Sequence, residues 1–301
     1  MTGKKQKLSK RALRQNVLAW ALLSPTLLFV ALFTFYPFVK TIYLSFFRKN
    51  LTSPQEVFIG LENYISSFQD PVFQKVLGNN AKFSLIVVPS CIILGLGLAC
   101  LLNTRHRGVS LARAAVFYPN ISSMIGFSLI WMFLLTPNIG FVSNVMQLFR
   151  LPVINFLGDP NYVLYSLMIV YIWREAGFVM IFFLSGMQGI SQEYYEAATI
   201  DGAGSWTKFF RITLPLLMPT MVFVLTFTII NSVKMVDSII VMTNGGPDNA
   251  SSLLMFHIYK TAFSFWDQGS AAALSVIMLA VVLAVTLLEY YVTDKLTYYE
   301  S

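Results

Sequence analysis

The sequence predicts an all-α integral membrane protein with six transmembrane helices. Three observations predict this class: 56% of the 301 residues are hydrophobic, only 12% are charged, and the apolar residues gather in membrane-length runs. Soluble domains carry roughly a quarter charged residues. A chain this apolar could not cover a globular surface in water, so the bilayer is the expected solvent.

The membrane domain is expected to cover residues 17–292. A helix needs about 20 apolar residues to cross the hydrocarbon core, and six windows meet this length: residues 17–38, 81–102, 114–136, 162–187, 218–242 and 271–292. The first window is too long for the apolar region of a signal peptide, roughly 7–15 residues, so it is expected to remain as a span. Pro25 and Pro89 lie inside windows and predict kinks rather than helix ends.

Basic residues predict the orientation. The net charge of +7 is concentrated mainly in residues 1–16, which indicates a cytoplasmic tail near anionic lipid headgroups rather than a nucleic-acid site. The loop after the second window is also basic. Six spans then return residues 293–301 to the cytoplasm as a short tail. The residues that carry this argument are Lys4, Lys5, Lys7, Lys10, Arg11, Arg14, Arg105, Arg107 and Arg113.

Metal and cofactor sites are not expected. Cys91 and Cys100 lie in one apolar run, too close along a helix to bridge each other, and His106 and His257 lie in separate connecting segments. No nucleophile elbow, phosphate-binding loop or dinucleotide fingerprint is present, so no catalytic residue is assigned.

Residues 188–215 form a polar segment between the fourth and fifth windows. Ser191 is expected to cap a short helix, and Gly202 and Gly204 to end it with a sharp turn. Ser205 is expected to cap the next helix, and Pro215 lies near the start of the fifth span, where proline is tolerated. The segment therefore predicts a rigid helix–turn–helix at the membrane face.

The order Glu-Ala-Ala, Asp-Gly-Ala-Gly and then Phe-Phe-Arg-Ile-Thr-Leu-Pro in this segment resembles the EAA loop of membrane subunits of binding-protein-dependent ABC importers. The resemblance implies the type I ABC-importer permease fold and a helix that docks into a separate ATPase subunit. The residues that it assigns to this coupling loop are Glu196, Ala197, Ala198, Asp201, Gly202, Gly204, Phe209, Leu214 and Pro215.

Two outer loops resemble the carbohydrate-uptake branch of that family: residues 58–64, and residues 243–247 followed by Tyr259 and Phe263. The second stretch is similar to the maltose-transporter F-like type. The chain lacks that protein's extra N-terminal spans, and it is closer to the compact lactose, glycerol-phosphate and oligosaccharide permeases. The resemblance implies a bacterial-type inner-membrane transport subunit without enzymatic activity. Its implied partners are a second permease, two ATP-binding subunits and an extracytoplasmic solute-binding protein.

Ionisable side chains within the windows are costly in a membrane and suggest a translocation cavity. Aromatic side chains nearby could stack on sugar rings. The candidates are Trp131, Tyr171, Trp173, Arg174, Glu175, Asn231, Lys234 and Asp237. The alternative is that Arg174 and Glu175 pair with residues of other helices and only hold the bundle together.

Alternative functions are weighed against an importer subunit. An ion-coupled secondary transporter would use Glu175 and Asp237 as relays, but the chain shows no paired six-span halves. An intramembrane enzyme would need a catalytic pair within the spans. For the importer, an oligosaccharide is the expected substrate, with an α-galactoside such as melibiose or raffinose as one candidate and glycerol-3-phosphate as another.

Overall fold

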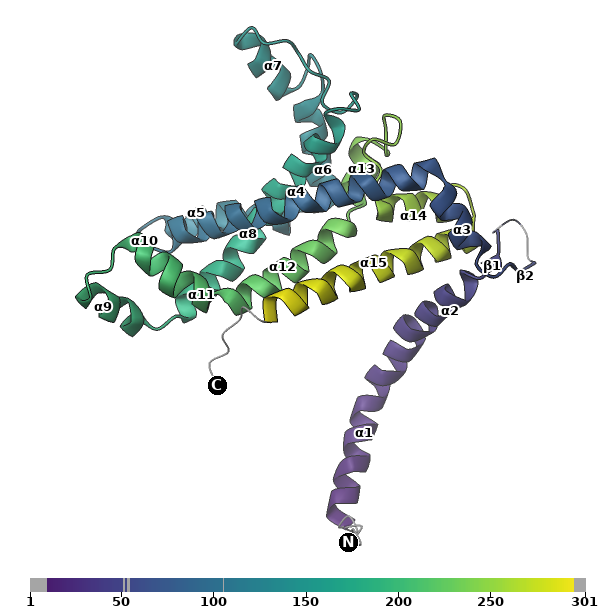
Figure 1. Ribbon diagram of the computed structural model, residues 1–301, viewed down its shortest axis with the longest axis horizontal. Helices are drawn as coiled ribbons and strands as arrows, with labels where there is room; N and C mark the ends of the chain where they lie inside the picture. Colours follow the sequence, from purple (N-terminus) through teal and green to yellow (C-terminus); the bar gives the residue numbers. More distant parts are fainter. Residues whose placement is uncertain (1–9, 51, 53–54, 105, 295–301) are drawn as a thin grey trace.

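The computed structural model describes residues 10–50, 52, 55–104 and 106–294. Its long helices run side by side in a bundle, and shorter segments leave the bundle at both ends and on both sides (Figure 1). Lys4, Lys5, Lys7 and Arg105, which support the predicted orientation, lie outside the described residues, as does most of the predicted tail 293–301. The bundle helices are α4 (Pro71–Leu102), α5 (Val109–Ile121), α8 (Val163–Gly189), α12 (Met218–Val233) and α15 (Gln268–Asp294).

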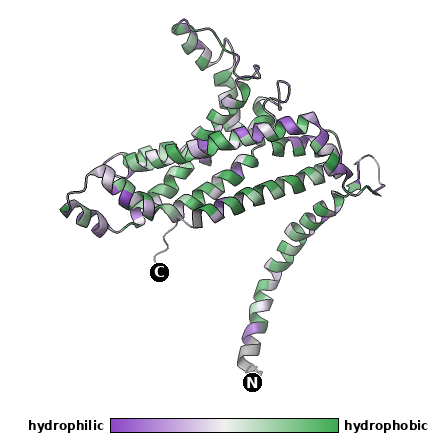
Figure 2. Cartoon of the chain, in the orientation of Figure 1, coloured by the Kyte–Doolittle hydropathy of each residue, from purple (hydrophilic) through white to green (hydrophobic). Residues whose placement is uncertain are grey.

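The first span projects away from the bundle as α1 (Lys10–Val30), the π-helical turn η1 (Ala31–Phe35) and α2 (Tyr36–Leu44) (Figure 1). The widened turn lies just before Pro37, which has no N–H for a regular helical bond and crowds the carbonyl four residues earlier. None of the apolar window of this span is buried within the chain, although it is strongly hydrophobic (Figure 2). Lipid or another protein must therefore cover it.

A small β-hairpin, which the sequence did not predict, joins the first span to the bundle. Strand β1 (Phe47–Arg48) pairs antiparallel with β2 (Val57–Phe58), and α3 (Glu62–Gln69) follows. The buried Asn63 Nδ2 donates to the carbonyl oxygens of Ser45 at 2.9 Å and Phe47 at 3.0 Å. These bonds fix the end of the first span against α3.

Helices α4 and α8 form the centre of the core. Helix α4 begins ten residues before the predicted apolar window because Asp70 caps it, accepting a hydrogen bond from the Val72 backbone N–H at 2.9 Å. Cys91, Gly95 and Ala99 are buried along one face of α4, where they form a stripe of small residues. A Cβ atom at Gly95 would lie 2.3 Å from Val179 Cγ1 of α8, so the glycine permits this close approach.

The third predicted span is not one straight helix. It consists of α5 and α6 (Met124–Leu135), whose axes differ by 99° at a break between Ile121 and Met124. The backbone of Ser122 and Ser123 is extended, with ψ angles of 149° and 132°. By length and composition, five of the described helices could cross a membrane, and the bent pair would make a sixth if it forms one span. Helix α7 (Phe141–Leu148) follows α6 on the side of the bundle.

The fifth span is also interrupted. Helix α12 ends at Val233, and a short helix, α13 (Asp237–Met242), continues after the non-helical residues 234–236. Buried serine hydroxyls connect both parts to neighbouring helices. Ser238 of α13 lies 2.7 Å from Ser128 of α6, and Ser232 of α12 lies 2.8 Å from Ser84 of α4.

The short helix α14 (Leu254–Phe263) precedes the last span. The preceding loop is fixed to α4 because Lys75 Nζ donates to Asp248 Oδ2 at 2.8 Å. This hydrogen bond and the charge of Lys75 lower the pKa of the Asp248 carboxyl below its ordinary value. The contribution of the pair is present at neutral pH and is lost as the pH falls through that lowered pKa.

Candidate coupling hairpin and polar cavity

The segment predicted to couple the chain to an ATPase forms a hairpin at one end of the bundle (Figure 1). We call residues 191–213 the α9 hairpin. Helix α9 (Gln192–Ile200) begins as predicted, because Ser191 Oγ accepts a hydrogen bond from the Glu193 backbone N–H at 3.3 Å. It ends at a left-handed residue, Gly202, with φ = +76°. The Ala203 N–H then donates to the Ala198 carbonyl at 2.8 Å, which closes the turn.

The second half of the hairpin, after Gly202, differs from the prediction at one point. Helix α10 (Ser205–Lys208) has Gly204 as its N-cap, and no side chain caps it, so the predicted capping role of Ser205 is wrong. The chain continues through a π-helical segment, η2 (Phe209–Thr213), and one short turn, α11 (Leu214–Leu216), into α12. A π-helical segment is rare and is frequently found at functional sites.

The α9 hairpin offers its surface to solvent in the isolated chain. None of the residues of α9 is buried, and Ile200 and Trp206 are 87% and 77% exposed. Ala198, Phe209 and Leu214 are half-buried. The other predicted coupling residues are exposed: Glu196, Ala197, Asp201, Gly202, Gly204 and Pro215. Large exposed apolar side chains that project from a rigid turn are typical of a protein-binding surface.

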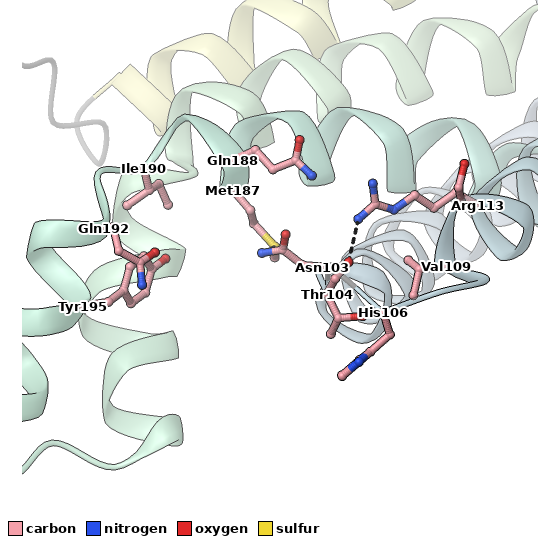
Figure 3. Close-up of a pocket in the computed structure, with 11 residues that line it drawn as sticks. Asn103, Thr104, His106, Val109, Arg113, Met187, Gln188, Ile190, Gln192 and Tyr195 are labelled. Carbon is pink, nitrogen blue, oxygen red and sulfur yellow. Dashed lines mark hydrogen bonds between the residues drawn. The ribbon is translucent and has the colours of Figure 1, made fainter.

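A second feature at this end of the bundle is a polar cleft of about 940 Å³ that no sequence pattern predicted. Figure 3 shows its two walls, with Gln192 and Tyr195 of α9 on one side and Asn103, Thr104 and His106 of the α4–α5 connection on the other. Arg113 was expected only to set the orientation. Its Nη2 donates to the Leu102 carbonyl at the end of α4, at 2.7 Å.

A polar cavity of about 350 Å³ lies among α5, α6, α8 and the break between α12 and α13. It brings together six of the eight residues predicted for a substrate cavity: Tyr171, Arg174, Glu175, Asn231, Lys234 and Asp237. Asn120, which was not predicted, also lines the cavity. A lone asparagine near the end of an apolar run gives no signal of its own.

Two of the charged side chains that line the cavity belong to adjacent residues of α8. Arg174 Nη1 and Glu175 Oε1 are 3.1 Å apart, so these neighbours on α8 pair with each other, and neither has an ion pair with another helix among the described residues. Among the described residues, two buried groups that line the cavity have no hydrogen-bond partner, the Tyr171 hydroxyl and Arg174 Nε. Buried polar groups are normally satisfied, so these two are available to a bound solute or to water.

Trp131 and Trp173 do not line the polar cavity. They pack edge to face, with ring centroids 6.2 Å apart, beside a separate apolar cavity of about 460 Å³. Trp173 lies on the exposed side of α8, whereas Tyr171 and Glu175 lie on its buried side. The predicted single cavity is therefore divided into a polar part and an aromatic part.

Comparison with known proteins identifies a family. Residues 92–298 match the family model described as "Binding-protein-dependent transport system inner membrane component". The chain is 35% identical to the sulfoquinovosyl glycerol transport system permease protein SmoG of Agrobacterium fabrum, over 91% of this chain and 89% of that protein. It is 31% identical to the trehalose/maltose transport system permease protein MalF of Thermococcus litoralis, over 93% of this chain and 94% of that protein.

A solved structure has the same fold. The crystal structure of a bacterial alginate ABC transporter in complex with its pentasaccharide-bound periplasmic protein contains a chain that superposes with a TM-score of 0.85. The alignment covers 97% of this chain and 99% of that one, at 21% sequence identity. At this level of identity the match concerns the fold alone.

Proposed function

Because the chain belongs to the family of binding-protein-dependent transport system inner membrane components, we propose that it moves an oligosaccharide into the cytoplasm by alternating access. The coarser function follows from the family: the chain is a multi-pass inner-membrane permease subunit of a sugar ABC importer, and ATP is hydrolysed in separate subunits. It is therefore a transport subunit and not an enzyme, and the ion-coupled alternative is set aside.

The observation that carries the proposal is the exposed α9 hairpin. Helix α9 has nine residues and none of them is buried, so contacts with the apolar core of the chain do not explain its sequence. Its apolar side chains and its fixed glycine turn instead suit a surface that another protein covers. We assign this hairpin to the ATPase subunits, with one ATPase bound here and a second bound to the partner permease. Under this assignment the α9 end of the bundle lies in the cytoplasm, and we propose the same side of the membrane for both chain termini.

The first span supports a second permease as partner. Its apolar window has no buried residue within the chain, and α2 is the part of it that packs against α15. A second subunit of similar fold would bury part of this surface. The solute-binding protein would then approach the opposite end of the bundle, where the β-hairpin, α3 and the loop before α14 lie (Figure 1).

The polar cavity is our candidate for the solute site. Tyr171 and Arg174 offer buried hydrogen-bonding groups, and Lys234 and Asp237 flank the break in the fifth span. Sugar hydroxyls both donate and accept hydrogen bonds, so they can satisfy amide, hydroxyl and charged groups together. The Trp131–Trp173 pair provides aromatic faces in the neighbouring cavity.

Neutralising the cavity charges tests this site. We expect Lys234→Met and Asp237→Asn each to raise the half-saturating sugar concentration for uptake at least about tenfold. A hydrogen bond to a charged group contributes roughly 1.5–3 kcal/mol, and about 1.4 kcal/mol corresponds to tenfold. Uptake is measured in cells that lack their own permease. Lys82→Met, a charge on α4 outside the cavity, is the control. Unchanged affinity and rate in normally assembled complexes would reject the site.

The identity of the sugar is a narrower proposal. We retain an α-galactoside such as melibiose or raffinose as the first candidate, with glycerol-3-phosphate as the alternative. A relative that is 26% identical is the sn-glycerol-3-phosphate transport system permease protein UgpA of Escherichia coli. An uptake panel that includes these compounds and sulfoquinovosyl glycerol would decide among them, since the transported solute accumulates in the cells.

A further inference from the structure

We propose that the hydrogen bond between Tyr195 and Thr213 transmits the movement of α9 to the fifth span, which makes these two residues positioning residues for coupling. The proposal rests on the assignment of the α9 hairpin to the ATPase. It adds the path by which force leaves the hairpin. It predicts that α9 moves together with η2 and α12, and not with the α4–α5 connection.

The first step is that α9 is not held by packing. None of its residues is buried, so no apolar core links it to the bundle. A force applied to its exposed side can leave it only through the chain at its two ends or through side-chain bonds. The chain at its C-terminal end turns at Gly202, where glycine alone adopts the left-handed conformation without strain. Gly202 is exposed, so this turn alone does not join α9 to the buried core.

The second step is the bond across the hairpin. The Tyr195 hydroxyl lies 2.9 Å from Thr213 Oγ1, and Thr213 is buried at the end of η2. Leu217, four residues further on, is fully buried and lies against Gly186 of α8, since a Cβ atom there would be 2.8 Å from Leu217 Cδ2. The bond therefore joins the exposed helix to a point that is anchored in the core.

A second contact supports the first. Lys208 Nζ donates to Thr199 Oγ1 at 2.7 Å, and the same hydroxyl donates to the Tyr195 carbonyl at 2.6 Å. Both bonds are exposed to solvent, where water competes for the groups. We therefore expect the partly buried Tyr195–Thr213 bond to contribute more to the stiffness of the hairpin.

The third step is the cleft between α9 and the α4–α5 connection. Tyr195 and Gln192 face a space of about 940 Å³, across which lie Asn103 and Thr104 of the α4–α5 connection (Figure 3). Helix α9 can approach or leave this connection without overlapping it. Helix α9 is therefore bonded to the segment that leads into the fifth span and is separated by the cleft from the α4–α5 connection.

The experiment uses the complete importer in proteoliposomes with Tyr195→Phe, Thr213→Val and the double variant. The readout is the number of sugar molecules taken up per ATP hydrolysed. We expect each single variant to lower this ratio about fivefold, which corresponds to about 1 kcal/mol for one hydrogen bond. The double variant should lower it no further, because both changes remove the same bond. Thr213→Ser keeps the hydroxyl and should restore the ratio.

Tyr43→Phe, at an exposed tyrosine of α2 outside the α9 hairpin, is the matched control and should retain the wild-type ratio. A wild-type ratio in Tyr195→Phe, or additive losses in the double variant, would overturn the inference. Failure of the ATPase subunits to co-purify with the wild-type chain would instead overturn the proposed function. If Thr213→Val does not assemble, Tyr195→Phe alone still decides, because it leaves the buried end of the bond in place.

Discussion

Gly177→Ala is expected to prevent the chain from accumulating as a folded, monodisperse permease. A Cβ atom at this position of α8 would lie 2.2 Å from the Val116 carbonyl oxygen and 2.9 Å from the Val116 carbonyl carbon of α5. Both are backbone atoms, so no side-chain rotation can relieve the overlap. Helices α5 and α8 would have to separate along their whole contact, at a cost of roughly 1–3 kcal/mol or more.

The consequence extends to the polar cavity, because α5 contributes Asn120 to it and α8 contributes Tyr171 and Arg174. The measurement is the yield and thermal midpoint of the detergent-solubilised protein by size-exclusion chromatography. Gly189→Ala is the matched control on the same helix, where an added Cβ meets nothing within 4 Å. A Gly177→Ala protein with the yield and midpoint of Gly189→Ala would show that the two helices are not packed as described.

The spans were predictable because their length and apolar composition are local properties of the chain. The breaks within them were not. The third window is mainly apolar, and it bends by 99° at Ser122 and Ser123, just after Pro119 and Asn120. Proline and serine also occur within membrane helices that do not bend so sharply. The sequence of residues 234–236 likewise contains no residue that predicts a break, since Lys234 could have stood within an uninterrupted helix. What stabilises each break is packing between α6 and α13, including the Ser128–Ser238 bond, which joins residues 110 positions apart.

The candidate sites were also predictable only where the signal is local in the sequence. The turn of the α9 hairpin follows from Ser191 and Gly202, whose effects act within a few residues. The cavity residues were predicted from the cost of placing charge in a membrane, and six of the eight meet. The two tryptophans were assigned by residue type alone. Their position depends on which side of α8 faces the core, and the nearly uniform hydrophobicity of that helix does not reveal it.

Gly202→Val is expected to uncouple ATP hydrolysis from sugar uptake while leaving membrane insertion intact. Gly202 has φ = +76°, and a side chain in the left-handed region costs about 1–2 kcal/mol, with β-branched residues the least tolerated. No atom lies within 4 Å of an added Cβ, so conformation alone causes the effect. The turn would open, and the bonds from Gly202 and Ala203 to the last turn of α9 would be lost.

A misdirected α9 would present Ile200 to the ATPase at the wrong angle, so we expect the transport ratio to fall about tenfold, on the order of 1.4 kcal/mol. Gly202→Asn separates conformation from side-chain size, because asparagine tolerates the left-handed region, and it should retain most of the coupling. Gly204→Val should cost less than Gly202→Val, since Gly204 has an ordinary φ of −72°. Uptake and hydrolysis are measured together in proteoliposomes. Wild-type coupling in Gly202→Val would mean that the shape of this turn does not matter for force transfer, and the hairpin would lose its assigned role.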